Sequence, residues 1–243
     1  MRWLIFSKRC AKEILRDPLN IVFGLGFPVV LLLLLSLIQS NISVDLFEIS
    51  SLVPGVSVFG LSFMTLFSAT LISKDRESLF AQRLYTMPLR ASDFILGYML
   101  PIVPIAVVQS LVCYAVATVL GLPVAINIVY CVLMIIPISV FYVALGLLCG
   151  SVLTVKQVGG VCGALLTNLS AWLSGIWFDL NLLGETFVKI SNVLPFVHAV
   201  ENQRATLNGT YSDAWLHLLV VLIYAVITTI VAIVVYLRQM KRR

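Results

Sequence analysis

Residues 2–38 read RWLIFSKRCAKEILRDPLNIVFGLGFPVVLLLLLSLI, and this stretch decides the fold. Its second part, Leu19–Ile38, is almost wholly apolar and has the length of about 20 residues that an α-helix needs to cross a bilayer. Its first part mixes basic and apolar residues and cannot span. The chain is therefore predicted to enter a membrane from its basic side.

Five further apolar runs of similar length follow this first span. They are Leu52–Ile72, Phe94–Leu120, Ile126–Gly150, Val158–Phe178 and Trp215–Tyr236. A soluble domain carries about 25% charged residues, whereas this chain of 243 residues carries 11% and is 60% hydrophobic. The sequence predicts an all-α polytopic membrane protein with six transmembrane helices, organised as one domain over residues 1–243.

The basic residues orient these spans. Six spans place both termini on one side, and 14 of the 16 Lys and Arg residues fall there. They are Arg2, Lys8, Arg9, Lys12, Arg16, Lys74, Arg76, Arg83, Arg90, Lys156, Arg238, Lys241, Arg242 and Arg243, against Lys189 and Arg204 on the other side. Basic loops stay in the cytoplasm, so we expect cytoplasmic termini. The net charge reports topology and does not indicate nucleic-acid binding.

Residues 2–17 have an amphipathic pattern. On a helical wheel Phe6, Cys10 and Ile14 share an apolar half, opposite a basic half. Such a segment is typical of an interfacial helix in the headgroup plane of the bilayer. Two interpretations remain open: an anchor that only orients the chain, or a lateral elbow that also packs against a partner subunit.

Residues 74–92 read KDRESLFAQRLYTMPLRAS and form the longest internal connection on the basic side. Apolar residues at helical spacing, among them Phe80 and Leu84, predict a short amphipathic helix that ends at Pro88. The segment is either a solvated loop or a coupling helix that receives force from a cytoplasmic partner.

The longest connection on the other side is 179–214. Its apolar stretch is too short to span and is broken at Pro195, which predicts a re-entrant or interfacial helical hairpin on the external side. His198, Glu201 and Arg204 approach one helical face and predict a polar network. No Ser or Cys nucleophile stands beside His198, so the pattern does not indicate catalysis.

The span interiors hold no Asp, Glu, Lys, Arg or His near their middle. Phe59, Phe63 and Phe67 form an aromatic ridge, and Asn168 is a polar residue of the fifth span. These four residues serve either helix packing or a translocation path. The five cysteines show no CxxC pairing, so neither a disulfide frame nor a metal site is indicated.

The basic-side connection resembles a motif of the type-2 ABC transporter permease family. That family's loop often reads E-R-E-R-G-T-L-E-x-L-x-x-T-P, and residues 75–88 align with it without a gap. The acid–Arg–Glu start at Asp75 matches, as do Leu84 and Pro88. The family's Gly-Thr pair is replaced here by Leu79 and Phe80.

The external connection resembles the same family more closely. The family shows P-x-x-[YH]-x-V-[DE]-x-x-R before its last span, and Pro195, His198, Val200, Glu201 and Arg204 stand at those positions. Residues 173–178 read LSGIWF, which is similar to the family's L-S-G-x-x-F. The resemblance covers nearly the whole chain.

The resemblance implies roles for two sets of residues. The set that couples the chain to an ATPase is Asp75, Arg76, Glu77, Phe80, Leu84 and Pro88, and the set that forms an external gate is Pro195, His198, Glu201 and Arg204. It also implies a complex of two permeases, identical or paralogous, with two cytoplasmic ABC ATPase subunits in a plasma membrane, of bacterial origin.

The chain has no G-x-x-x-x-G-K-[ST] segment, so it is not expected to be an enzyme, and ATP and Mg²⁺ are expected on the partner ATPase. The favoured function is export of a hydrophobic or amphipathic drug or antimicrobial peptide. Export of a lipid, glycolipid or polysaccharide is the alternative within the architecture. An ion-coupled secondary carrier is the alternative of another class, and the absence of ionisable residues deep in the spans disfavours it.

Overall fold

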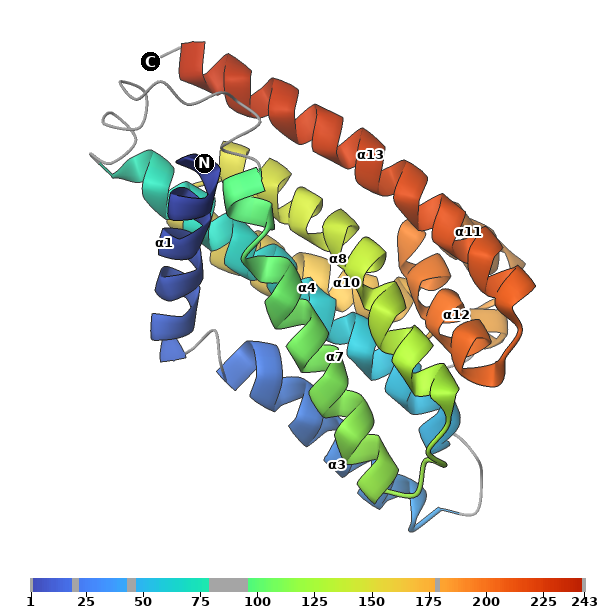
Figure 1. The fold of residues 1–243 in the computed structure, drawn as a ribbon. Coiled ribbons are helices and arrows are strands. Elements are labelled where there is room, and N and C mark those ends of the chain that lie inside the picture. Colours follow the sequence, from blue (N-terminus) through green and yellow to red (C-terminus); the bar gives the residue numbers. More distant parts are fainter. Residues whose placement is uncertain (1, 19–21, 43–46, 79–95, 178–179, 242–243) are drawn as a thin grey trace.

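The computed structural model describes residues 2–18, 22–42, 47–78, 96–177 and 180–241 (Figure 1). The α-helices are α1 (Arg2–Arg16), α3 (Phe27–Gln39), α4 (Ile49–Glu77), α7 (Ile102–Val119), α8 (Ile126–Val152), α9 (Val155–Val158), α10 (Thr167–Leu173), α11 (Glu185–Val193), α12 (Pro195–Asn208) and α13 (Tyr211–Lys241). Two π-helical segments, η1 (Val22–Gly26) and η2 (Gly159–Leu166), and a 3₁₀ turn, η3 (Leu180–Leu183), complete the elements. These residues include no strand, which confirms the all-α class.

Five of the six predicted spans are long apolar helices. The helical runs that are long and apolar enough to cross a membrane are Val22–Gln39, Ile49–Glu77, Leu96–Val119, Ile126–Val152 and Tyr211–Gln239. Each coincides with a predicted span to within a few residues. Both termini lie at the same end of the bundle (Figure 1), which we call the termini end.

The predicted span Val158–Phe178 is different from the other five. In its place α9, η2 and α10 follow one another without a gap as one helical run from Val155 to Leu173, whose middle part is π-helical. The run starts among polar residues and stops before Gly175, whose φ of +67° is left-handed and favours glycine. Phe178 lies outside the described residues. The part of the predicted span from Val158 to Leu173 is therefore helical, and the helix ends before residue 178.

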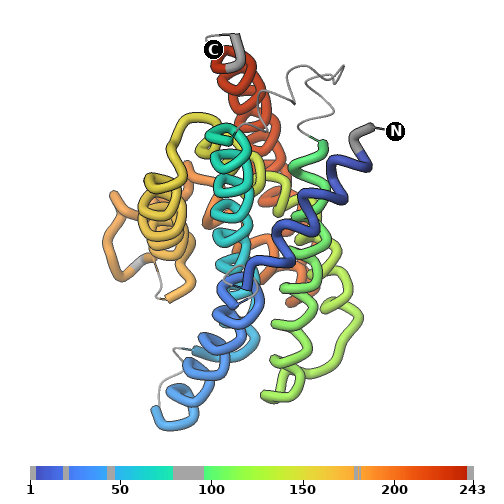
Figure 2. The backbone as a smooth tube through the Cα atoms, turned by 90° about the vertical axis from the view of Figure 1, so that its left-hand side faces the viewer, coloured from blue at the N-terminus to red at the C-terminus, as the bar shows by residue number. Residues whose placement is uncertain are grey.

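Helix α4 is the central element of the bundle. Of its membrane-spanning window, 89% of residues are buried, compared with 22% for the peripheral α13. Figure 2 shows α4 between α7 on one side and the helical run of α9, η2 and α10 on the other, with α1 crossing obliquely in front. A helix surrounded in this way must offer small side chains or grooves to its neighbours.

The closest approach to α4 is made by α8, through Gly146 and Gly150. A Cβ at Gly146 would stand 2.4 Å from the Thr65 carbonyl oxygen, and one at Gly150 would stand 2.6 Å from the Ala69 carbonyl oxygen. The Thr65 hydroxyl also donates a hydrogen bond of 2.8 Å to the Tyr142 carbonyl of α8. This is a small-xxx-small contact in which two helix backbones meet.

We predict that Gly146→Ala destabilises the bundle by about 1–3 kcal/mol, because the added methyl group meets backbone that cannot yield. The measurement is thermal unfolding of the detergent-solubilised chain. Gly163→Ala is the matched control, since its Cβ would lie 3.5 Å from the Leu66 side chain, an ordinary contact. Equal unfolding midpoints for the two variants would contradict close packing at Gly146.

Candidate functional site

The last turn of α4 carries four consecutive charged residues, Lys74–Glu77, which we call the charged tetrad. The predicted coupling helix was to begin here, but α4 continues through these residues and ends at Glu77, with Ser78 in an extended conformation. The predicted start of a separate helix at residue 74 is therefore wrong. The remaining coupling residues, Phe80, Leu84 and Pro88, lie outside the described residues.

Asp75 joins three elements at the termini end. Its side chain is 7% exposed and accepts two hydrogen bonds from the Arg9 guanidinium of α1, at 2.8 and 2.6 Å. It also accepts a hydrogen bond of 2.9 Å from the Tyr98 hydroxyl, in the helical turn 96–99 that precedes α7. The hydrogen bond with Asp75 raises the pKa of Arg9 above its ordinary value. This ion pair holds α1 on α4.

Arg76 binds the end of α8 and reaches α13. Its guanidinium donates hydrogen bonds to the carbonyl oxygens of Ser151 and Leu153. These lie at the C-terminal end of α8, where carbonyl groups have no backbone N–H partner within the helix. A cation at a helix C-terminus is also favoured by the helix dipole. A third hydrogen bond, of 3.2 Å, runs to the Gln239 side chain in the last turns of α13.

Glu77 and Lys74, the outer two residues of the tetrad, bind two further segments of the chain. The Glu77 carboxylate accepts a hydrogen bond of 3.0 Å from the backbone N–H of Val155, the first residue of α9. Lys74 forms an ion pair of 3.8 Å with Asp17, just after α1. Four adjacent residues of one helix thus contact α1, α8, α9, α13 and the turn before α7.

The apolar face of α1 packs on the protein. Phe6, Cys10 and Ile14 are buried, and the Phe6 ring meets the Tyr98 ring edge-on at 4.9 Å between centroids. Burial raises the pKa of the Cys10 thiol to about 12, with Asp75 adding to the shift. These three residues therefore pack on the bundle of the chain itself.

The predicted helical hairpin is present as α11 and α12. The chain is extended at Leu194, and Pro195 is the first residue of α12, so the predicted break is confirmed. Helix α12 is inserted into the bundle: Asn202 and Gln203 are fully buried, and Gln203 accepts a hydrogen bond of 3.1 Å from the Tyr114 hydroxyl of α7.

Arg204 connects this hairpin to two other elements. It forms an ion pair with Glu201 at 2.8 Å, as the sequence predicted. It also donates hydrogen bonds to the carbonyl oxygens of Gly175, at 3.0 Å, and Ser51, at 3.4 Å. Arg204 therefore joins the turn after α10 to the beginning of α4.

His198 does not contact Glu201 and Arg204 as predicted. Its Nε2–H donates to the Asn192 carbonyl at 2.9 Å, and its Nδ1 forms a hydrogen bond of 2.8 Å with Nδ1 of His217. The bond joins α12 to α13. Sequence reasoning missed His217 because it stands 19 residues away, inside an apolar helix.

The four candidate path residues divide into two groups. Phe59, Phe63 and Phe67 are buried within the chain, where the rings of Phe23, Phe27 and Trp177 pack against the ridge. Asn168 is exposed, and its amide nitrogen donates to the Ala164 carbonyl of its own helix at 2.8 Å. Of these four residues, only Asn168 faces away from the bundle.

The site shows no arrangement for catalysis or metal binding. Within the described ranges, no group of three or more His, Cys, Asp or Glu residues could hold a metal ion. The five cysteines are free. The arrangement can instead transmit force between helices, because its charged groups connect helix ends.

The fold and these contacts define an integral membrane subunit whose polar residues gather at the two ends of one central helix. The ABC-2 type transporter family model matches residues 1–208, and the chain belongs to that family. It is the membrane permease component of an ABC transporter, and the ATPase activity resides in partner subunits. A comparison with curated proteins finds no match.

The Arg9–Asp75 pair generates a stability prediction. We expect Arg9→Ala to lower the free energy of unfolding by about 1–3 kcal/mol, because it leaves the buried Asp75 without its charged partner. The lower part of this range is favoured because the Arg9 side chain is 36% exposed. The measurement is thermal unfolding in detergent.

Glu13→Gln is the matched control for this pair. It removes the other acidic partner of Arg9, a residue of the same helix that is itself 36% exposed, and should change stability by less than about 0.5 kcal/mol. Combining Arg9→Ala with Asp75→Asn should cost less than the sum of the single changes. Strict additivity would show that the pair is not coupled.

Arg204 generates a second prediction, at the opposite end. Arg204→Ala should destabilise by roughly 1.5–3 kcal/mol, since it removes an ion pair and the hydrogen bonds to the Gly175 and Ser51 carbonyl groups. Glu201→Gln should cost less than about 1 kcal/mol. Lys189→Ala is the control, because its pair with Glu185 is 79% and 91% exposed. The ranking of unfolding midpoints is the test, and equal effects of Arg204→Ala and Lys189→Ala would refute the bridging role.

Proposed function

We propose that this chain is the permease subunit of an ATP-driven exporter for a hydrophobic or amphipathic cargo. In this proposal two permease copies, or one copy and a paralogue, work with two ABC ATPase subunits that bind ATP and Mg²⁺. The termini end faces the cytoplasm of a bacterial cell, in agreement with the basic excess on that side. The hairpin end faces the exterior.

The charged tetrad supports coupling to an ATPase. It immediately precedes residues 79–92, the rest of the proposed coupling segment, and it is bonded to α1, α8, α9 and α13. A displacement of that segment would therefore move several helix ends together. Because α4 also contacts Arg204 through Ser51 at its other end, the same helix reaches the proposed external gate.

The exposed position of Asn168 is the observation that supports a cargo path between two chains. The aromatic ridge fills the interior of the single bundle, so it leaves no obvious route there. An amide side chain facing hydrocarbon is costly, whereas one facing a second chain or a cargo finds hydrogen-bonding partners. Its neighbours Gly160 and Ala164 are also exposed and small, which suits close approach of another helix.

The apolar character of the chain favours amphipathic cargo, and a drug or antimicrobial peptide is the preferred class. A lipid, glycolipid or polysaccharide would use the same path between two chains. An ion-coupled carrier is disfavoured by the membership of the ABC-2 type transporter family.

The test is cargo-stimulated ATP hydrolysis by the permease reconstituted with its ATPase in vesicles. We expect amphipathic peptides or drugs to raise hydrolysis, and Asn168→Trp to abolish that stimulation while basal hydrolysis remains, because the indole would fill the path. Leu133→Trp is the control, since Leu133 is an exposed apolar residue of α8 and should keep wild-type stimulation.

Two outcomes would refute the proposal. Transport that continues without ATP and stops when an ionophore collapses the ion gradient would indicate a carrier. Unchanged stimulation in Asn168→Trp would remove Asn168 from the path.

A further inference from the structure

Three basic side chains on one face of α1 have no acidic partner. Lys8, Lys12 and Arg16 are exposed, and in the part of the chain that the structure describes none of them forms an ion pair. They follow one another at intervals of four residues, which places them about 6 Å apart along the helix. Three cations held this close repel one another unless an anion lies among them.

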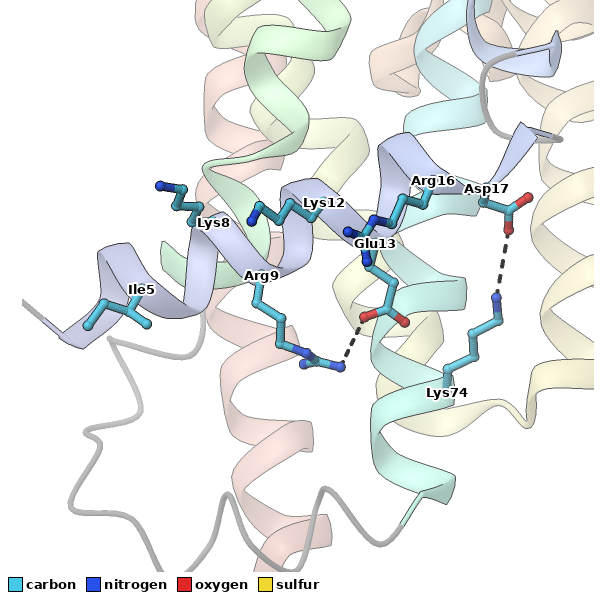
Figure 3. A pocket seen from close by; sticks show the side chains of 8 residues that line it. All are labelled: Ile5, Lys8, Arg9, Lys12, Glu13, Arg16, Asp17 and Lys74. Carbon is cyan, nitrogen blue, oxygen red and sulfur yellow. Dashed lines mark hydrogen bonds and ion pairs between the residues drawn. The ribbon is translucent and has the colours of Figure 1, made fainter.

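These residues line a cleft of about 730 Å³ at the termini end (Figure 3). The other charged residues of its lining are already paired: Arg9 with Glu13, and Lys74 with Asp17. Figure 3 shows Lys8 on the side of α1 opposite Arg9. The uncompensated charge of the cleft therefore comes from the three free cations.

Apolar side chains stand beside these cations. Ile5 lines the cleft and is 77% exposed, and Leu15 of the same helix is 56% exposed. Val22 and Phe23, at the beginning of the first membrane-spanning run, are exposed as well. A soluble anion would leave this apolar surface uncovered. An amphiphile with an anionic headgroup would pair with the cations and cover the apolar side chains as well.

We propose that this cleft binds the headgroup of an anionic phospholipid. The phosphodiester would lie among Lys8, Lys12 and Arg16, and the acyl chains would extend along Ile5 and the start of the first span. The lipid belongs to the leaflet at the termini end, where α1 crosses the bundle. It would hold the outer face of α1 while the Arg9–Asp75 pair holds the inner face. This proposal does not depend on the transport function.

The test uses the full chain in detergent, titrated with short-chain phosphatidylglycerol, and thermal unfolding reports binding. Short-chain phosphatidylcholine and glycerol phosphate are the comparison ligands. We expect phosphatidylglycerol to raise the unfolding midpoint at concentrations where the other two do not. Replacing the three cations by glutamine (K8Q/K12Q/R16Q) should weaken this binding roughly 100-fold. Each basic residue near an anionic lipid raises the affinity about fivefold, and three such factors multiply.

The matched control removes the same number of charges elsewhere. Lys156, Lys189 and Arg238 are exposed and lie outside the cleft, so K156Q/K189Q/R238Q should bind phosphatidylglycerol as the wild type does. The unfolding midpoint of K8Q/K12Q/R16Q without lipid should equal that of the wild type, which shows that the variant is folded.

Three results would overturn the proposal. Equal stabilisation by glycerol phosphate would assign the cleft to a soluble phosphate. Equal stabilisation by phosphatidylcholine would remove any role for the anionic headgroup. Unchanged phosphatidylglycerol binding in K8Q/K12Q/R16Q, with loss of ATPase binding, would assign the three cations to a protein partner.

Discussion

The contact between α4 and α8 is the constraint on which the rest of the structure depends. Gly146 and Gly150 bring the backbone of α8 against the carbonyl groups of α4, and the Thr65 hydroxyl adds a hydrogen bond across the interface. In a membrane no hydrophobic force draws helices together, so close backbone contact and hydrogen bonds must do so. With α8 in this position, α4 lies at the centre and every other long helix packs around the pair.

The central position of α4 explains where the polar residues are. Its middle is buried and holds no charged residue, and its charged groups occur where the helix leaves the bundle. At the termini end the charged tetrad bonds to the ends of surrounding helices. At the hairpin end the Ser51 carbonyl accepts from Arg204. A buried helix with contacts at both ends suits the proposed coupling between an ATPase at one end and a gate at the other.

Helix α1 has two distinct faces, one packed on the bundle and one exposed. The buried face combines an apolar contact of Phe6 with the Arg9–Asp75 pair, so it fixes the helix on the bundle. The exposed face carries cations without partners beside apolar residues. The amphipathic pattern of the sequence alone predicts only that the helix has one apolar half and one basic half. The structure shows that the apolar half is divided, because Phe6, Cys10 and Ile14 are buried whereas Leu4 and Leu15 are exposed.

The sequence by itself determined the spans that are long and apolar, the break at Pro195 and the pairing of Glu201 with Arg204, because each depends on residues close together in the chain. Only the tertiary structure decided the partners of Asp75 and Arg76, which stand 66 residues from Arg9 and 163 residues from Gln239. It also decided that the aromatic ridge is buried and that the helix of the fifth predicted span has a π-helical middle and ends at Leu173. Hydropathy and periodicity are local properties, whereas the choice of a distant partner depends on how the helices pack.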